Sequence, residues 1–302
     1  MRMVYQIITK KFLLCLAFLL SANSFAACPP NGMSLNTLEH LKAAKWQIVE
    51  ATQRQQTALA LLACLSDPNP RLRDEIAFEA LSFWMRNELL TLETVHQIRE
   101  QLLIRLVDKS IVDEHGFAKP FAALTLAEVA RIDRRKAFMS EAQRQEMVEI
   151  AALYLSQITD FRGFDEKSGW RHGVAHAADW MMQLSLNPAL NKTQHETMLA
   201  ALAQQIRNEQ HFYQYGEAER LMTPVFYLAL RSTLSNSEWD AWFTSLLETK
   251  LDLKNTSQAS LARKHNLTAF LSALYINLQE SKQAALQEKM LPIVIRSMKK
   301  LN

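Results

Sequence analysis

Glycine, proline and cysteine are scarce in this chain. Its 302 residues include six glycines, eight prolines and three cysteines. The few glycines and prolines leave long stretches without the residues that interrupt helices, and nothing after the N-terminal region shows the sustained alternation of apolar and polar residues that marks a strand. The sequence therefore predicts an all-α protein.

The chain also has no excess of charge of one sign once its N-terminal segment is left out. The chain has 34 basic and 31 acidic residues, and three of the basic ones, Arg2, Lys10 and Lys11, lie near the N-terminus. If that segment is removed, 31 basic residues balance 31 acidic ones. Nothing in this balance indicates the basic surface that nucleic acids or anionic membranes attract, and no nucleic-acid partner is expected.

Residues 1–26 have the three parts of a secretory signal peptide. Basic residues come first, an apolar run from Phe12 to Leu20 follows, and Ser24 and Ala26 supply the small residues that precede a cleavage site. The run is shorter than the roughly 20 residues that span a bilayer. We expect cleavage after Ala26, a periplasmic or secreted mature chain that forms one helical domain over residues 27–302, and no transmembrane segment after cleavage.

Removal of the signal peptide would also remove Cys15 and leave Cys28 and Cys64. Two thiols in an oxidising compartment usually pair, so a disulfide between them is expected. The alternative is that Cys64, which follows Leu61-Leu62-Ala63, is a small buried apolar residue. A further alternative concerns location, because Phe25-Ala26-Ala27-Cys28 partly matches a lipoprotein cleavage site that would anchor the chain through Cys28.

Amphipathic segments separated by short turns describe most of the mature chain. Apolar stripes predict helices over 71–89 and 91–107, and caps at Ser140, Thr193 and Ser235 predict helices over 140–158, 193–206 and 236–249. The proline-bearing turn before Arg73 resembles the turn of a HEAT-type repeat, although no second copy is evident. The predicted architecture is a HEAT-like superhelix of stacked antiparallel helix pairs, with a closed α/α toroid as the alternative.

The segment 160–180 differs from the rest of the chain. It holds Gly163, Gly169 and Gly173, half of all the glycines, which indicates a backbone that turns tightly or approaches another group closely. His172, His176 and Asp179 follow at helical spacing, which places the three side chains on one face of a helix. That face is the predicted functional centre.

Three functions are open for this face. The two imidazoles and the Asp179 carboxylate could bind a divalent metal, with Asp165 as a fourth ligand. His176 could instead act as an acid or base that Asp165 or Asp179 orients. The alternative to both is structural: His172 caps the start of the helix, His176 donates a buried hydrogen bond, and Asp179 accepts one from Arg171 or a neighbouring helix. Gly173 stands where the HExxH metalloprotease motif has its glutamate, so the base of that motif is missing.

Further side chains are predicted to join this centre. Glu217 and Arg220, at the start of another predicted helix, are expected to face the histidines, although glutamate is also favoured at a helix N-terminus for electrostatic reasons. Trp170 could serve as a binding platform or as a core residue. Lys119, in a loop that enters a third helix, could reach a cleft or remain in solvent.

Four segments together resemble the bacterial family designated domain of unknown function 2785. They are Arg73 to Phe78, Phe121 to Ala127, Gly163 to Asp179, and Gly216 to Leu221, and the third carries the most specific pattern. The resemblance spans about residues 65–230 and implies an all-helical, HEAT-like fold but no activity. Lys119 departs from the arginine expected there, which argues against a bidentate anion contact by that loop.

Two functions follow from these observations. The first is a binding or scaffold module of the cell envelope, whose helical surface would take a protein, peptide or glycan. The second is an envelope hydrolase or lyase that uses His172, His176 and Asp179, with Glu217 in the same cleft and with or without a metal. The absence of a complete catalytic motif favours the first function. We expect the protein to have no cofactor, with a bound divalent metal as the alternative.

Overall fold

The structure is a computed structural model in which residues 28–30, 32–111, 113–231, 233–248 and 257–301 are described. The predicted signal peptide and its cleavage site lie outside these residues, so both stay predictions. Within the described residues, no helix has the length and apolar character needed to cross a bilayer. The prediction of an all-α fold is confirmed, because helices form all but one small hairpin of the regular structure.

The N-terminal half of the fold comprises α1 (Leu35–Ala43), α2 (Ala51–Leu61), η1 (Leu62–Ser66), α3 (Pro70–Leu72), η2 (Arg73–Phe78), α4 (Glu79–Arg86), α5 (Leu92–Val107), α6 (Ala118–Arg135) and α7 (Glu141–Gln157). A two-stranded hairpin, β1 (Phe164–Asp165) and β2 (Gly169–Trp170), separates this half from the next. The C-terminal half comprises α8 (Gly173–Ser185), α9 (Lys192–Ile206), α10 (Glu217–Arg231), α11 (Asn236–Leu247), α12 (Gln258–Glu280) and α13 (Ala284–Leu301).

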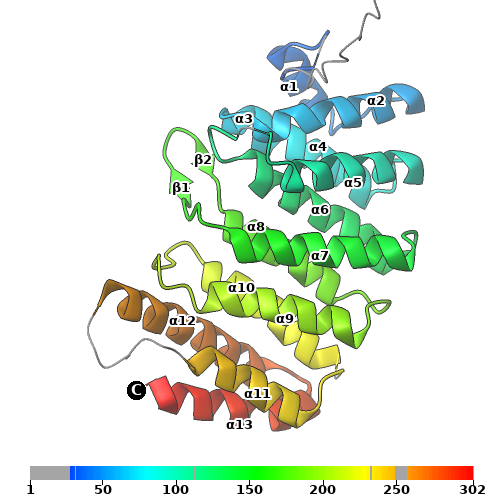
Figure 1. Cartoon of the computed structure of the whole chain (residues 1–302). Coiled ribbons are helices and arrows are strands. Elements are labelled where there is room, and N and C mark those ends of the chain that lie inside the picture. The colour runs from blue at the N-terminus through cyan, green and yellow to red at the C-terminus, as the bar shows by residue number, and fades with distance from the viewer. Residues whose placement is uncertain (1–27, 31, 112, 232, 249–256, 302) are drawn as a thin grey trace, which may run out of the picture.

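The helices form a stack of two layers (Figure 1). Helices α4, α6, α8, α10 and α12 pack in that order in one layer, and α2, α5, α7 and α9 pack in the other. Helices α11 and α13 pack against each other at the C-terminal end. The first and last units lie at opposite ends of the stack (Figure 1), so the structure has the predicted open stack of helix pairs and not the alternative closed toroid.

Alternate helices in such a stack run in the same direction, because each helix is antiparallel to the next one along the chain. Helices α6, α8 and α10 therefore begin at the same edge of the stack, and the hairpin lies at this edge, beside α3 (Figure 1). Every segment that carries a predicted site residue ends or begins here. The topology therefore gathers side chains that are far apart in the sequence.

Helix starts follow the capping chemistry of the sequence. Ser140 with Gln143 and Ser235 with Glu238 form complete capping boxes at the starts of α7 and α11, as predicted. The cap predicted at Thr193 is wrong, because α9 begins at Lys192 and its N-cap is Asn191, which forms a capping box with Gln194. Asparagine is the stronger N-cap of the two residue types, and the asparagine box leaves Thr193 inside the first turn.

The helix predicted over 71–89 is not a regular α-helix. It begins with α3 at Pro70, widens into the π-helical turn η2 from Arg73 to Phe78, and returns to α-helical geometry in α4. Asn69 caps the start through its side chain, which accepts from the N–H of Arg71. Apolar periodicity could not show the π turn, because it changes the backbone ladder without changing which residues are apolar.

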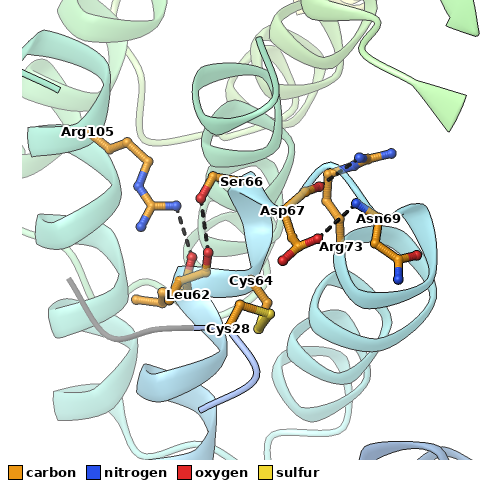
Figure 2. Close-up of a disulfide and its surroundings, with 9 residues drawn as sticks. Cys28, Leu62, Cys64, Ser66, Asp67, Asn69, Arg73 and Arg105 are labelled. Atoms are coloured by element: carbon orange, nitrogen blue, oxygen red, sulfur yellow. Dashed lines mark hydrogen bonds between the residues drawn. A yellow bond between two sulfur atoms is a disulfide. The ribbon is translucent and has the colours of Figure 1, made fainter. Parts of the chain in front are cut away.

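The predicted disulfide between Cys28 and Cys64 is present, with Cα atoms 5.0 Å apart (Figure 2). It ties the start of the described chain to η1, where Leu62 also accepts a hydrogen bond from Arg105 at 2.9 Å. The alternative of Cys64 as a free buried thiol is wrong. Lipidation would require the Cys28 Sγ that this disulfide uses, so a Cys28 in this bond cannot also carry a lipid; the location of the protein stays a prediction.

Removal of the disulfide is expected to destabilise the fold by about 3–4 kcal/mol, because the bond closes a loop of 36 residues in the unfolded chain. Urea denaturation of wild type and of a Cys28→Ser, Cys64→Ser double variant measures this effect. A reductant should lower the wild-type midpoint toward that of the variant and leave the variant unchanged. Equal midpoints in the oxidised state would contradict the expectation.

Candidate functional site

The hairpin β1–β2 forms one wall of the candidate site, and two glycines shape it. A Cβ added to Gly163 would lie only 2.0 Å from the ring of Tyr215, so the close approach of that ring requires glycine here. Gly169 has a left-handed backbone with φ of +72° at the start of β2. Both uses agree with the interpretation of the glycine cluster as a place of tight turns and close contacts.

Arg73, which is fully buried, anchors this hairpin to the N-terminal part of the stack. Its Nη2 donates to the Ser168 carbonyl and to Asp74, each at 2.7 Å, and its Nη1 donates to the Asp67 carbonyl at 2.9 Å. Its guanidinium carbon also lies 3.7 Å from the ring centroid of Phe117. Burial raises the pKa of Asp74 to about 6, although the positive charge of Arg73 opposes the shift.

His172 reaches the site from a strained position. It is the N-cap of α8 and has a left-handed backbone, with φ of 55° and ψ of 39°, so it stands one residue before the helix that carries His176 and Asp179. Its ring still lies 5.9 Å from that of His176, and its Nε2 lies 3.0 Å from the Tyr215 carbonyl. Burial lowers the pKa of His172, partly offset by Glu217 and the carbonyl.

His176 lies deeper in the protein and is only 8% exposed. Its ring makes an edge-to-face contact with Phe121, with centroids 5.1 Å apart, and its Nδ1 has no hydrogen bond of good geometry, although the Pro120 carbonyl is near. Burial, aided by the nearby His172 and Arg220, lowers the pKa of His176 to about 3. The ring is therefore neutral at physiological pH.

The acidic members of the predicted site already have partners. Asp179 accepts from Arg220 Nη1 through both carboxylate oxygens at 2.5 Å. Burial raises the pKa of Asp179 while Arg220 opposes the shift. Glu217, nearly fully buried at the start of α10, accepts from the N–H of Tyr215 at 2.8 Å, and its Oε1 lies 3.9 Å from His172 Nε2.

Asp165 does not join these residues. Its carboxylate accepts from the N–H groups of Lys167 and Ser168 at 3.0 and 2.8 Å, and thus closes the hairpin turn. The sequence suggested a metal ligand or an orienting carboxylate because Asp165 precedes the histidines by only a few residues. A carboxylate two or three residues before free N–H groups caps its own turn instead.

The geometry of a metal site is not formed. Within the described ranges, no group of three or more His, Cys, Asp or Glu side chains is arranged to hold a metal ion. An acid–base pair is not formed by the four predicted catalytic residues either. His176 is a very weak base, Asp179 is paired with Arg220, Glu217 caps the backbone at Tyr215, and Asp165 closes the hairpin turn.

Three aromatic side chains form the exposed part of the site, here called the aromatic platform: Phe164, Trp170 and Tyr215. Their exposures are 48%, 40% and 40%, and no other aromatic side chain in the described part of the chain is as exposed. Ring centroids are 5.0 Å apart for Phe164 and Trp170 and 5.6 Å apart for Trp170 and Tyr215. His172 stacks on Trp170 at 4.7 Å.

Sequence reasoning selected Trp170 but passed over Phe164 and Tyr215. The available signal was the position of each aromatic residue beside a glycine, Phe164 after Gly163 and Tyr215 before Gly216. The second tryptophan near the histidines, Trp180, is fully buried and belongs to the core. Helical spacing could not separate these two tryptophans, because Trp170 precedes α8 and lies in β2.

Lys119 lies apart from the aromatic platform. It lines a cavity of about 500 Å³ on the side of Gly173 that faces α7, together with Arg171 and Tyr154. The structure thus joins Trp170, His172, His176, Asp179, Glu217 and Arg220 in one cluster, and it places Lys119 in another site.

Residues 106–276, more than half of the chain, match the family described as Protein of unknown function (DUF2785). The chain belongs to this family. No curated protein and no solved structure matches it. The matched range of this DUF2785 member contains the aromatic platform, the histidine cluster and the cavity beside Lys119, whereas Arg73 and the disulfide lie before it.

Acidification is expected to destabilise the protein through His176. Its pKa is about 3 in the folded state and near 6.5 in an unfolded chain. The unfolded state therefore binds the proton first, and stability is lost as pH falls below 6.5, by about 2 kcal/mol at pH 5. Urea denaturation at pH 7.5 and pH 5 measures this loss, which His176→Gln should remove.

The variant must be compared with wild type at each pH, because Asp74 contributes with the opposite sign. Its raised pKa of about 6 means that the folded state takes up that proton first, which adds stability as pH falls. His40→Gln, at an exposed histidine of α1, is the control and should keep the wild-type pH dependence. If the free energy of unfolding falls equally between pH 7.5 and pH 5 in wild type and in His176→Gln, a buried neutral His176 is excluded.

Proposed function

We propose that this protein is an exported, non-catalytic binding module of the cell envelope and that the aromatic platform is its contact surface for a partner protein. The predicted signal peptide and the disulfide support export, because disulfides persist in oxidising compartments such as the periplasm. The polar cluster beneath the platform, in which Asp179 and Glu217 already have partners, supports binding over catalysis. Its hydrogen bonds hold the platform in place and leave no acid–base pair among the predicted catalytic residues.

The observation that carries the proposal is that the most exposed aromatic side chains of the described residues gather at one place. Tryptophan, tyrosine and arginine are the residue types that dominate the binding energy of protein interfaces. Trp170 and Tyr215 supply two of them, and Arg220, whose side chain is half exposed, lies on the α10 segment that follows Tyr215. Large exposed apolar side chains that touch one another commonly mark an interaction site.

The platform is also rigid, which lowers the entropic cost of binding. Tyr215 packs on the backbone of Gly163, and the carbonyl of Tyr215 meets the ring of His172. Trp170 is held between His172, Phe164 and Tyr215, and its strand is tied to the N-terminal part of the stack through Arg73 and Ser168. A partner would therefore meet aromatic side chains that are already ordered.

The chemistry of the platform restricts the mode of binding. Strands β1 and β2 have only two residues each, too few to pair with an added strand of a partner. The platform is aromatic with one guanidinium beside it, so it fits a folded protein surface that presents apolar side chains and an acidic or carbonyl oxygen toward Arg220. A glycan is the competing ligand, and the experiment must distinguish the two.

Trp170→Ser is expected to weaken binding of the partner about 30-fold, the effect of a central interface tryptophan. Quantitative affinity purification from envelope extracts identifies a protein retained by wild type and by the control Leu230→Ser, whose exposed side chain lies near the other end of α10. Binding is then measured between the two purified proteins. Circular dichroism verifies that each variant folds.

Retention of the same proteins by wild type and Trp170→Ser would reject the platform as the contact surface. Binding of purified envelope polysaccharide, lost in Trp170→Ser and unchanged in Leu230→Ser, would replace the protein partner with a glycan. Turnover of envelope material that His176→Gln abolishes without loss of fold would reject the non-catalytic assignment.

A further inference from the structure

A cavity in the described part of the chain lies beside the aromatic platform but is separate from it. It is formed by the end of α5, the start of α6, the second half of α7 and the start of α8, and its volume is about 500 Å³. Sites for small molecules commonly have volumes of about 300–1,000 Å³. The cavity therefore has the size of a small-molecule site, and none of the residues of the aromatic platform lines it.

Three cationic side chains line this cavity: Lys109, Lys119 and Arg171. Among the described residues, neither lysine ammonium forms an ion pair or a side-chain hydrogen bond. Arg171 donates from Nε to the His115 carbonyl at 2.7 Å, and its guanidinium carbon lies 4.5 Å from the ring centroid of Phe117. Within the residues that the structure describes, Arg171 forms no ion pair with a carboxylate. These two contacts hold the guanidinium at the cavity, where the carboxylates of Asp160 and Asp165 interact with its charge without forming a salt bridge.

The two acidic side chains of the cavity are already engaged. Asp160 accepts from Arg162, with Nε at 2.8 Å and Nη2 at 2.5 Å. Asp113 accepts from the N–H groups of Phe117 and Lys119 at 2.9 and 3.2 Å, where it caps the start of α6. The uncompensated charge at the cavity is thus positive, although the nearby carboxylates would repel a ligand that carries two negative charges.

The cavity is also lined by neutral hydrogen-bond donors, which are the first N–H groups of α8 and the Tyr154 hydroxyl. Gly173 lines it, and α8 begins there with no side chain capping its first N–H groups, so the positive end of this helix is unneutralised. The Tyr154 hydroxyl lies 3.5 Å from where a Cβ of residue 173 would be. That hydroxyl has no partner in the described part of the chain, and burial raises its pKa, so it remains a donor.

The remaining wall is apolar. Ile150, Leu153 and Ile158 come from α7 and the residue after it, and Leu106 and Val107 come from the end of α5. Val107 and Leu153 are exposed at the rim, where they present apolar surface to solvent. The cavity therefore combines a cationic, donor-rich end with an apolar wall that reaches the surface.

We propose that this cavity binds a small amphipathic carboxylate. Its single negative charge would lie between Lys119, Arg171 and the N-terminus of α8, with the Tyr154 hydroxyl as a further donor, and its alkyl chain would lie along Leu153 and Ile158. A carboxylate satisfies these donors with one charge, which the two acidic neighbours tolerate. This site is independent of the proposed partner protein, and either proposal can fail alone.

Isothermal titration calorimetry with decanoate, decyl phosphate, decanol and acetate tests the proposal on the purified protein. Decanoate should bind at one site, and decanol and acetate should each bind at least tenfold more weakly, because each lacks one half of the recognised chemistry. Lys119→Glu and Arg171→Gln should weaken decanoate binding by roughly tenfold or more. Lys136→Glu, at the other end of α6, is the matched control and should bind as wild type does.

The proposal is overturned if decanoate shows no saturable binding, or if Lys119→Glu and Lys136→Glu bind it equally well. Decanol binding as tightly as decanoate would remove the role of charge. Decyl phosphate binding more tightly than decanoate would replace the carboxylate with a phosphate headgroup. Thermal denaturation of each variant without ligand verifies that the fold persists. Leu153→Ser, which alters the apolar wall without adding a charge, should also weaken decanoate binding.

Discussion

Arg73→Met is expected to destabilise the protein by about 3–5 kcal/mol, the cost of removing one partner from a buried charged network. The guanidinium has no exposed surface and supplies donors to the carbonyls of Asp67 and Ser168 and to the Asp74 carboxylate. A methionine fills much of the volume but offers none of these hydrogen bonds. Urea denaturation gives the free energy of unfolding.

The same variant should loosen the hairpin selectively, because the bond to Ser168 joins the hairpin to η2. Hydrogen exchange of residues 164–170 should become faster than in wild type. Arg71→Met is the matched control, since Arg71 lies two residues away, is exposed and pairs with Glu39 on the surface, where ion pairs contribute about 0–1 kcal/mol. Unchanged exchange in the hairpin of Arg73→Met would show that the hairpin does not depend on this anchor.

Asp133→Ala is expected to cost a similar 3–5 kcal/mol, because it leaves the largely buried guanidinium of Arg144, the buried amide of Asn187 and two backbone N–H groups without their acceptor. The fully buried carboxylate accepts from Arg144 at 2.6 and 3.0 Å, from the N–H groups of Phe138 and Met139 at 2.9 Å, and from Asn187 at 2.7 Å. One side chain thus joins α6, α7 and the turn after α8. The measurement is the free energy of unfolding in urea.

Asp240→Ala is the comparison, because Asp240 pairs with Arg296 while both side chains are about half exposed, and that change should cost no more than about 1 kcal/mol. Burial would raise the pKa of Asp133, but its hydrogen bonds outweigh burial and hold it below the ordinary value. The contribution of Asp133 to stability is therefore fully present at a pH above its pKa in the unfolded chain. That contribution is lost as the pH falls below this pKa. Equal costs for the two variants would contradict the role of Asp133 as a buried junction.

Local chemistry predicted the elements whose signals are contained within a few residues. Ser140 and Ser235 cap α7 and α11 because a hydroxyl followed three residues later by an amide or acid suffices for the capping box. The same reasoning placed the start of α9 at Thr193 because it overlooked the stronger asparagine box two residues earlier. The π turn η2 gave no signal, since apolar periodicity does not report the hydrogen-bond pattern of the backbone.

The candidate site was predicted in composition but not in its interactions. The spacing of His172, His176 and Asp179 predicted that the three side chains lie on one face of a helix. In the structure His176 and Asp179 lie on α8, whereas the left-handed His172 precedes it. Asp179 pairs with Arg220, 41 residues away, and Tyr215 contacts Gly163, 52 residues earlier. Pairings over such distances depend on the register of α8 against α10, which no local pattern encodes.

The sequence by itself determined the all-α class, the disulfide partners, the family and the segments that carry chemistry, because composition, caps and spacing are local properties. Only the tertiary structure decided how those segments meet. It buried His176 against Phe121, closed the hairpin turn with Asp165, gathered Trp170 and Tyr215 into one exposed platform, and placed Lys119 in a separate cavity. The physical reason is that burial and charge pairing follow from the parallel alignment of α6, α8 and α10, which bring their first turns to one edge of the stack.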